Sequence, residues 1–200
     1  MRDTVVVFAR APRLGAVKRR LARELGARAA LRFHQQTLRN TVRKLRAVRC
    51  FRVLLAVTPD RASARWPRHV ARVPQGGGDL GRRMHRACRR FRNRRVVLVG
   101  SDIPDLSAAD AVAAFRALGR ADAVFGPAAD GGYWLVGLSP RRPARPFAAV
   151  RWSSEHALAD TLANFRGRRI ALLRTLQDVD TAADYRAVAY ARRTSPITSF

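Results

Sequence analysis

Short apolar runs alternate along this chain with longer segments of helical character, and this alternation constrains the fold more than any other feature. The clearest runs are TVVVFA at residues 4–9, FRVLLAV at 51–57 and RVVLVG at 95–100. They are apolar almost throughout, which is typical of strands buried on both faces of a mostly parallel sheet. Shorter strands are expected at residues 123–125, 134–138 and 169–173.

The segments between these runs are expected to be helices. Asp79 and Ser107 are placed to cap two of them, and Asp110 follows Ser107 at the spacing of a capping box. Residues 61–78 are expected to form a loop. The predicted helices are 17–25, 27–48, 80–91, 107–118, 153–165 and 181–192. This order of elements predicts an α/β protein with three layers (α/β/α), a mostly parallel sheet and one domain over residues 1–200.

Arginine dominates the charge of the chain. There are 40 Lys and Arg residues against 14 Asp and Glu, which gives a formal net charge of +26. The arginines are spread over the whole length and are not interleaved with aromatic residues. We therefore expect weak, salt-dependent attraction to nucleic acids and no specific nucleic-acid function. A non-catalytic basic binding module remains the alternative from another class.

The apolar runs and the cysteines bear on the cellular compartment of the protein. No apolar stretch reaches the roughly 18 residues of a membrane span, and the first apolar run is too short for a signal peptide. Cys50 and Cys88 form no CxxC pair, so a zinc site or a disulfide framework is not expected. The sequence predicts a cytoplasmic protein without a membrane span.

Ligands of parallel sheets bind beyond the carboxyl ends of the strands, so the residues after each strand are the candidates for a site. The loop after the first strand contains Gly15 and leads into a helix with the cations Lys18 and Arg20. Backbone N–H groups, the helix dipole and these side chains could bind phosphate oxygens. The alternative is a basic first turn that faces water.

Acidic residues follow two other predicted strands. Asp102 comes directly after residues 95–100, where a carboxylate is a natural ligand for Mg²⁺ together with substrate phosphates. The alternative for Asp102 is an Asx turn before Pro104. Asp180 lies between a predicted strand and the last predicted helix, where it could cap that helix or join Asp102 on a metal ion.

A glycine turn at residues 126–134 combines an acid, Asp130, with Gly131, Gly132 and Tyr133. Paired glycines permit positive φ and close approach of a ligand to the backbone. An Asp-Gly turn between two strands needs no ligand, and the two interpretations are evenly matched.

Five of these segments, in this order, resemble the bacterial selenodomain-associated transferase family, which was long labelled a domain of unknown function. They are residues 9–21, QGGGDLGRRM at 75–84, GSDIPDL at 100–106, GPAADGGYWLVGL at 126–138 and DVDTAAD at 178–184. The resemblance implies the GT-A fold of nucleotide-diphospho-sugar transferases. It also implies a relationship to small nucleotidyltransferases such as the CMP-sugar synthetases.

The resemblance implies roles for particular residues. Gly15, Lys18 and Arg20 would hold nucleotide phosphates, with Lys18, Arg20 and Asp102 as the catalytic residues. Asp102 and Asp180 would bind Mg²⁺ or Mn²⁺. The residues expected near the base are Gln75, Gly78 and Asp79, and those expected to face the acceptor or sugar are Asp130, Gly131, Gly132 and Tyr133.

Two transfer reactions fit these expectations. A basic loop after the first strand slightly favours nucleotidyl transfer from a nucleoside triphosphate to a small phosphorylated acceptor. Glycosyl transfer from a nucleotide-sugar is the alternative, although an Asp-x-Asp pair is typical of that class and Asp102-Ile103-Pro104 lacks it. Both reactions need cations that stabilise a leaving pyrophosphate group.

Overall fold

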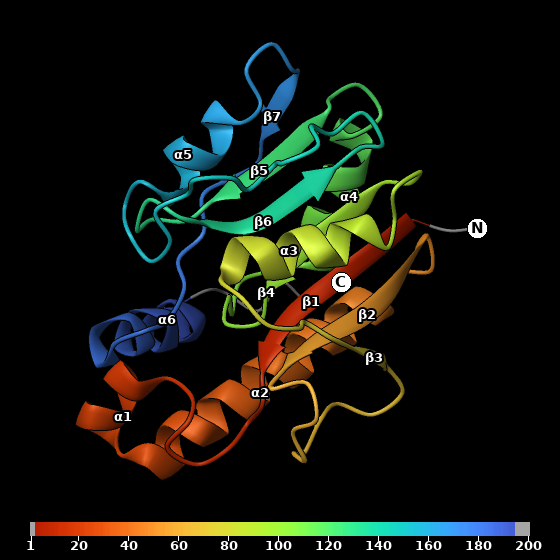
Figure 1. Cartoon of the computed structure of the whole chain (residues 1–200). Helices are drawn as coiled ribbons and strands as arrows, with labels where there is room; N and C mark the ends of the chain where they lie inside the picture. The colour runs from red at the N-terminus through yellow and green to blue at the C-terminus, as the bar shows by residue number, and fades with distance from the viewer. Residues whose placement is uncertain (1–2, 195–200) are drawn as a thin grey trace.

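The computed structural model describes residues 3–194 and arranges them around a central sheet (Figure 1). The strands are β1 (Asp3–Arg10), β2 (Phe51–Thr58), β3 (Ala71–Pro74), β4 (Val96–Gly100), β5 (Ala123–Pro127), β6 (Tyr133–Leu138) and β7 (Ile170–Leu172). The helices are α1 (Arg19–Leu25), α2 (Ala27–Arg46), α3 (Leu80–Arg89), α4 (Ala108–Ala117), α5 (Ala157–Ala163) and α6 (Ala182–Thr194).

The sheet is mostly parallel, as the sequence predicts. Its strand order is β3-β2-β1-β4-β6-β5-β7, and β6 alone of these strands runs antiparallel to its neighbours. β1 lies between β2 and β4 and is parallel to both. The carboxyl ends of β1 and β4 therefore point to the same edge of the sheet, which is where the site is expected.

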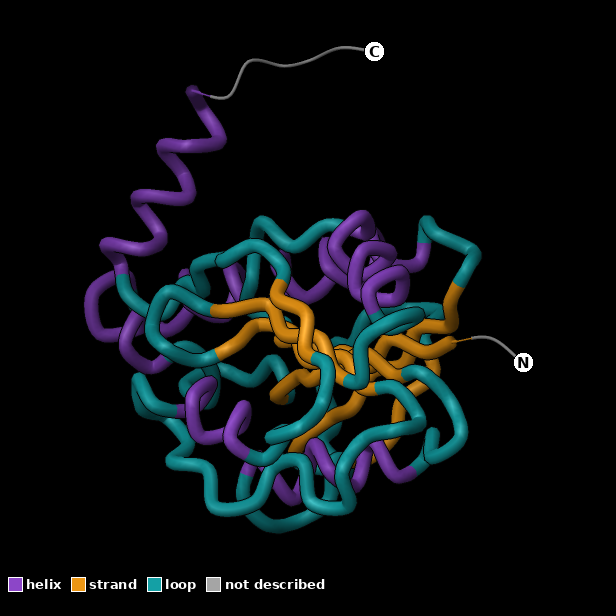
Figure 2. Tube along the Cα trace, turned by 90° about the horizontal axis from the view of Figure 1, so that it is seen from above, coloured by secondary structure: helices purple, strands orange, loops and turns teal. Residues whose placement is uncertain are grey.

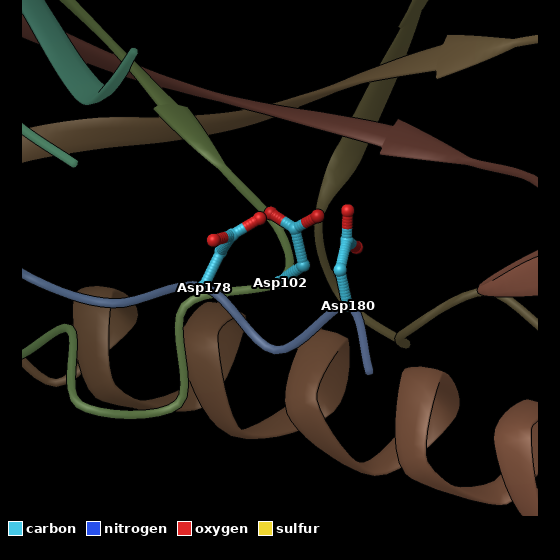
Figure 3. Close-up of side chains that lie close together, drawn as sticks. All are labelled: Asp102, Asp178 and Asp180. Atoms are coloured by element: carbon cyan, nitrogen blue, oxygen red, sulfur yellow. The ribbon is translucent and has the colours of Figure 1, made fainter. Parts of the chain in front are cut away.

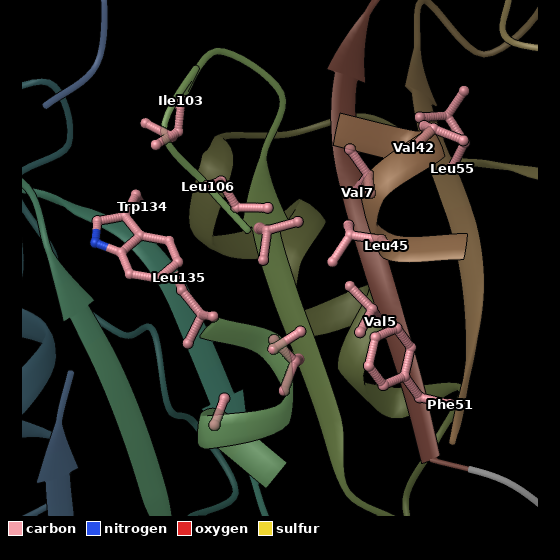
Figure 4. Packing of buried hydrophobic residues seen from close by; sticks show 14 of the residues in the cluster. Val5, Val7, Val42, Leu45, Phe51, Leu55, Ile103, Leu106, Trp134 and Leu135 are labelled. Carbon is pink, nitrogen blue, oxygen red and sulfur yellow. The ribbon is translucent and has the colours of Figure 1, made fainter. Parts of the chain in front are cut away.

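Helices cover both faces of the sheet, which confirms the three-layer α/β/α architecture (Figure 2). Val5 and Val7 of β1 pack on one face with Leu45 of α2 (Figure 4). Phe115 of α4 belongs to the same cluster. Val6, on the other face, packs in a second cluster that includes Met84 of α3. Successive β1 residues face opposite layers, so a strand covered on both sides has to be apolar throughout.

Several predicted boundaries are wrong. β3 lies within residues 61–78, where the sequence predicts a loop, because this edge strand is short and largely exposed and so lacks an apolar run. The helix expected at 153–165 is shorter in the structure, where only α5 is helical. Ser153 cannot belong to it, because its φ of 60° does not occur in an α-helix. The helix expected at 17–25 begins at Arg19, because Lys18 has left-handed backbone angles.

The predicted caps of two helices are present. Asp79 accepts a hydrogen bond from the backbone N–H of Arg82 at the start of α3. Ser107 and Asp110 form a full capping box on α4, and Arg174 donates to both carboxylate oxygens of Asp110 at 2.8 and 2.9 Å. The Arg174 contact ties the segment after β7 to the start of α4 and so holds that segment across the ligand edge of the sheet.

Candidate active site

Three carboxylates meet at the carboxyl edge of the sheet (Figure 3). Asp102 follows β4, whereas Asp178 and Asp180 lie on the extended segment between β7 and α6. One oxygen of each carboxylate lies within 4.8 Å of an oxygen of the others. Alternate residues of an extended chain point to the same side, so Asp178 and Asp180 face Asp102 while Val179 between them is fully buried.

Lys18 reaches this cluster from the loop after β1. Its Nζ donates to Oδ2 of Asp102 at 2.9 Å and to Oδ1 of Asp180 at 2.7 Å, and its side chain is only 6% exposed. Burial by itself would lower the pKa of Lys18, but the charges of Asp102 and Asp180 outweigh it and the pKa is raised. The lysine is therefore charged at neutral pH.

The backbone of Lys18 adopts φ 47° and ψ 52°, in the left-handed region that residues other than glycine rarely occupy. Lys18 is the N-cap residue, at which the loop ends and α1 begins. Such strain persists where surrounding contacts hold it, and it is concentrated at functional sites. Lys18 combines this backbone conformation with the two ion pairs of its side chain.

Asp178 is the member of the cluster that the sequence-based prediction missed. Burial raises its pKa to about 6, and the negative charges of Asp180 and Asp102 contribute to this rise, against a smaller opposing effect of Lys18. Its spacing of two from Asp180 is the signal that could have found it, given an extended segment there.

The cluster suits a divalent cation. Carboxylate oxygens are the ligands that Mg²⁺ and Mn²⁺ prefer, and three carboxylates against one ammonium leave excess negative charge. The Lys18 ammonium between Asp102 and Asp180 shows that a cation fits there. The residues that could hold a metal ion are thus Asp102, Asp178 and Asp180.

A pocket of about 370 Å³ adjoins the cluster. Asp102 and Asp178 of the cluster line it, and Asp130 lines it as well. Its walls come from β4, β6 and the start of α3, and they are largely apolar or aromatic, with Met84 and Trp152 among them. The site is therefore a charged centre that opens onto a mainly apolar chamber.

Residues 41–154 match the model of a family described as uncharacterized proteins conserved in bacteria (DUF2064). The chain belongs to this family. The matched segment includes Asp102 and the lining residue Asp130, whereas Lys18, Asp178 and Asp180 lie outside it. No curated protein matches the chain.

Solved structures extend the comparison over nearly the whole chain. A candidate nucleotide-diphospho-sugar transferase from Desulfovibrio desulfuricans is 28% identical with a TM-score of 0.89, over 98% of this chain and 90% of that one. 4-Diphosphocytidyl-2C-methyl-D-erythritol synthase from Anaerococcus prevotii is 10% identical with a TM-score of 0.62 (96% and 99% covered). A manganese complex of Rv0371c from Mycobacterium tuberculosis is 17% identical with a TM-score of 0.55 (96% and 100% covered).

These comparisons confirm the expected family and the GT-A superfamily, and the 28%-identical neighbour supports an enzyme of the transferase type. The two neighbours below 25% identity show the shared fold. In residues 3–194 of this DUF2064 member, no helix combines the length and the apolar character that crossing a membrane requires.

The residues expected to bind the nucleotide differ in their position and exposure. Lys18 lies in the carboxylate cluster, but Gly15 and Arg20 are exposed, and the Arg20 side chain makes no hydrogen bond or ion pair within the described part of the chain. Gln75 is buried, and its side-chain amide donates to the carbonyl oxygens of Ala56 at 2.9 Å and Ala9 at 3.4 Å. That amide therefore links the ends of β1 and β2.

The other two residues expected near the base lie at the entrance to α3. Gly78 has a φ of 94°, and the carboxylate of Asp79 is used as the helix cap. Their neighbour Leu80 lines the pocket, so this turn borders the chamber. Their contact with a nucleotide stays a prediction.

The glycine turn between β5 and β6 borders the same pocket. Asp130, Gly132 and Tyr133 line it, and Oδ1 of Asp130 accepts a hydrogen bond from the N–H of Gly132 at 2.9 Å. Gly131 serves packing instead, because at φ 83° it lies against the backbone of Glu155, and a Cβ there would come 2.2 Å from the Glu155 oxygen. The turn thus both packs on the segment before α5 and presents Asp130 to the pocket.

The structure also shows whether Asp180 caps the last helix. The N-terminus of α6 is capped by Thr181, whose hydroxyl accepts from the N–H of Asp184 at 3.2 Å, while the Asp184 carboxylate accepts from the Thr181 N–H at 2.8 Å. The Asp180 side chain is not the cap, and it faces Lys18 instead.

Proposed function

We propose that this protein is a metal-dependent transferase that binds a nucleotide-activated donor at the Lys18 and carboxylate centre. The observation that carries the proposal is the convergence of Lys18, Asp102, Asp178 and Asp180 at the carboxyl edge of the sheet, beside a pocket. A cation, a set of carboxylates and an adjoining chamber are the parts needed to hold a polyphosphate next to an acceptor.

Asp102, Asp178 and Asp180 would hold Mg²⁺ or Mn²⁺, which when bound would neutralise charge on the leaving phosphates. The manganese complex of the mycobacterial neighbour supports a divalent ion in this fold. Lys18 would exchange a carboxylate for a phosphate oxygen when the nucleotide enters. Arg20 and the backbone at Gly15 would extend the phosphate site towards solvent, and Gln75, Gly78 and Asp79 would border the base.

Nucleotidyl transfer is the preferred reaction. An acceptor oxygen would attack the α-phosphorus of a nucleoside triphosphate, forming a phosphorus–oxygen bond as the bond to pyrophosphate breaks. Lys18, charged at neutral pH, would stabilise the developing negative charge. The name of the Anaerococcus neighbour, a diphosphocytidyl-compound synthase, supports this reaction for the fold.

Glycosyl transfer is the second candidate, and a different observation favours it. The Desulfovibrio structure, 28% identical and aligned over nearly the whole chain, is that of a candidate nucleotide-diphospho-sugar transferase. In this reaction an acceptor hydroxyl attacks the anomeric carbon of a nucleotide-sugar, and a nucleoside diphosphate leaves.

One experiment tests the proposal and separates the two reactions. The purified chain is incubated with each nucleoside triphosphate or nucleotide-sugar, Mg²⁺ or Mn²⁺ and a panel of acceptors. Release of pyrophosphate indicates nucleotidyl transfer, and release of a nucleoside diphosphate indicates glycosyl transfer. Neither product with any donor, together with no metal-dependent nucleotide binding, would overturn the proposal.

Variants of the carboxylates identify the metal site directly. Asp102→Asn and Asp180→Asn should each weaken Mn²⁺ binding at least about tenfold, measured by electron paramagnetic resonance of the free ion. Glu155→Gln is the matched control, since its side chain is 80% exposed and lies outside the cluster. Equal Mn²⁺ affinity in all three variants would show that the metal ion does not bind at these carboxylates.

A further inference from the structure

The lining of the pocket lacks the cations that dominate the rest of the chain. One residue in five is Lys or Arg, 40 of 200, yet none of the described residues that line the pocket is either. Three of the 14 acidic residues do line it, namely Asp102, Asp130 and Asp178. The charged side chains of the pocket lining are therefore all negative, although the chain as a whole has a net charge of +26.

Two arginines close in the chain to this lining are paired with carboxylates outside the pocket. Arg151, next to the lining residue Trp152, donates to both oxygens of Asp160 at 2.9 and 2.8 Å. Arg174, whose backbone oxygen accepts from the Trp134 indole, is paired with Asp110. An anion in the pocket would have to break one of these pairs to bind the guanidinium group of Arg151 or Arg174.

Lys18 does not supply the missing charge once a donor is bound. Under the proposed function its ammonium and the metal ion are both occupied by the phosphates of the nucleotide. A second phosphate in the pocket would then meet the nucleotide phosphates and Asp130 with no lining cation to neutralise it. Like charges placed together in this way repel each other, and such repulsion excludes the wrong partner.

The remaining walls suit an uncharged molecule with an apolar face. Tyr133 and Trp152 lie edge-to-face with ring centroids 6.3 Å apart, and Met84 and Leu80 line the same chamber. Asp130 uses one carboxylate oxygen for the Gly132 N–H, and a carboxylate is an acceptor for hydroxyl donors.

We infer that the pocket selects an uncharged, hydroxyl-bearing acceptor or transferred group and rejects its phosphorylated counterpart. This inference rests on the proposed function, because it names the substrate class of that same site. It replaces the small phosphorylated acceptor that the sequence suggests. Asp130 is the specificity-determining residue, since it lines the pocket outside the carboxylate cluster that would hold the metal.

The test compares molecules that differ only in a phosphate. Glucose against glucose 6-phosphate, and glycerol against glycerol 3-phosphate, are titrated by ligand-observed NMR onto the chain with and without Mg²⁺ and CTP, GTP or UDP-glucose. We expect each uncharged member to bind at least about tenfold more tightly in the loaded protein.

Three variants assign the preference to Asp130. Asp130→Asn keeps an oxygen for the Gly132 N–H and should reduce the preference about threefold, because Asp130 is partly screened by solvent. Asp130→Lys should reverse it in favour of the phosphorylated member. Glu24→Gln, which removes an exposed carboxylate of α1 that does not line the pocket, should leave the preference unchanged.

The inference is overturned if the phosphorylated members bind equally well or better, if neither member of either pair binds, or if Asp130→Lys leaves the preference as it was. Nucleotide binding is recorded in the same titrations. Loss of nucleotide binding with an intact preference for uncharged molecules would count against the proposed function, whereas the reverse result would count against this inference alone.

Discussion

Lys18 and Asp180 are 162 positions apart in the sequence, and their side chains are joined by a hydrogen bond of 2.7 Å. The contact closes the first loop of the sheet onto the segment before the last helix, and Asp102 completes it from the middle of the chain. A nucleotide or a metal ion that enters here therefore has to rearrange an existing ion-pair network.

Replacement of Lys18 should separate metal binding from turnover. In Lys18→Met the metal ion no longer competes with an ammonium for Asp102 and Asp180, so Mn²⁺ affinity should rise at least about tenfold. Turnover should fall about a hundredfold or more, because a cation that stabilises transition-state charge is lost. Arg23→Met, which removes an exposed cation of α1, is the control for both measurements. If Mn²⁺ affinity and turnover both fell, Lys18 and the metal ion would not compete for the two carboxylates.

Gly131→Ala should be markedly destabilising, and Gly26→Ala supplies a matched control. Both glycines have a φ of 83°, but a Cβ at Gly131 meets the Glu155 backbone, whereas Gly26 has nothing within 4 Å. We expect Gly26→Ala to cost about 1 kcal/mol of unfolding free energy and Gly131→Ala about 2–4 kcal/mol. Urea denaturation measures both values. Equal costs would show that the strain of φ, and not the packing of the turn, determines the effect.

The Asp110–Arg174 pair should make stability depend on acid pH. Burial alone would raise the pKa of Asp110, but hydrogen bonds from Arg174 and Ser107 outweigh it and lower the pKa below its usual value of 3.8. A lowered pKa gives stability that is present above pH 3.8 and is lost as the pH falls through the folded value.

Asp110→Asn should therefore cost about 1–3 kcal/mol at pH 7, and the difference from the native chain should shrink below about pH 4. Arg174→Gln should show the same pH dependence, and the double variant should cost less than the sum of the two. Urea denaturation at a series of pH values measures these costs. Additive costs would mean that the pair is not coupled.

The net charge of +26 should produce only non-specific binding of nucleic acids. Dispersed arginines release counterions from phosphates, so the affinity for duplex DNA or single-stranded RNA should fall steeply between low and physiological salt. Binding of a metal–nucleotide complex should fall less, because fewer phosphates are neutralised. Paired fluorescence titrations over this salt range measure both slopes. Tight, sequence-selective nucleic-acid binding at physiological salt, with no nucleotide bound, would favour a binding module over a transferase.

The sequence by itself determined the layers of the molecule. Residues 5–9 of β1 and all of β4 are apolar because both faces of these strands are buried, and that pattern is visible in the sequence alone. The Ser107–Asp110 box and the Asp79 cap are local in sequence, so their spacing alone predicted them. The rule that ligands bind beyond parallel strand ends singled out Lys18, Asp102 and Asp180.

Only the tertiary structure decided how those residues are used. The contacts of Lys18 with Asp102 and Asp180 are set by strand order and by the path of the chain after β7, which no local pattern encodes. The exposure of Arg20, the position of Asp178 in the carboxylate cluster and the absence of cations from the described pocket lining depend on side-chain direction. Periodicity reports which face of an element is buried, whereas a site is made of distances between elements, and those arise only when the whole sheet is assembled.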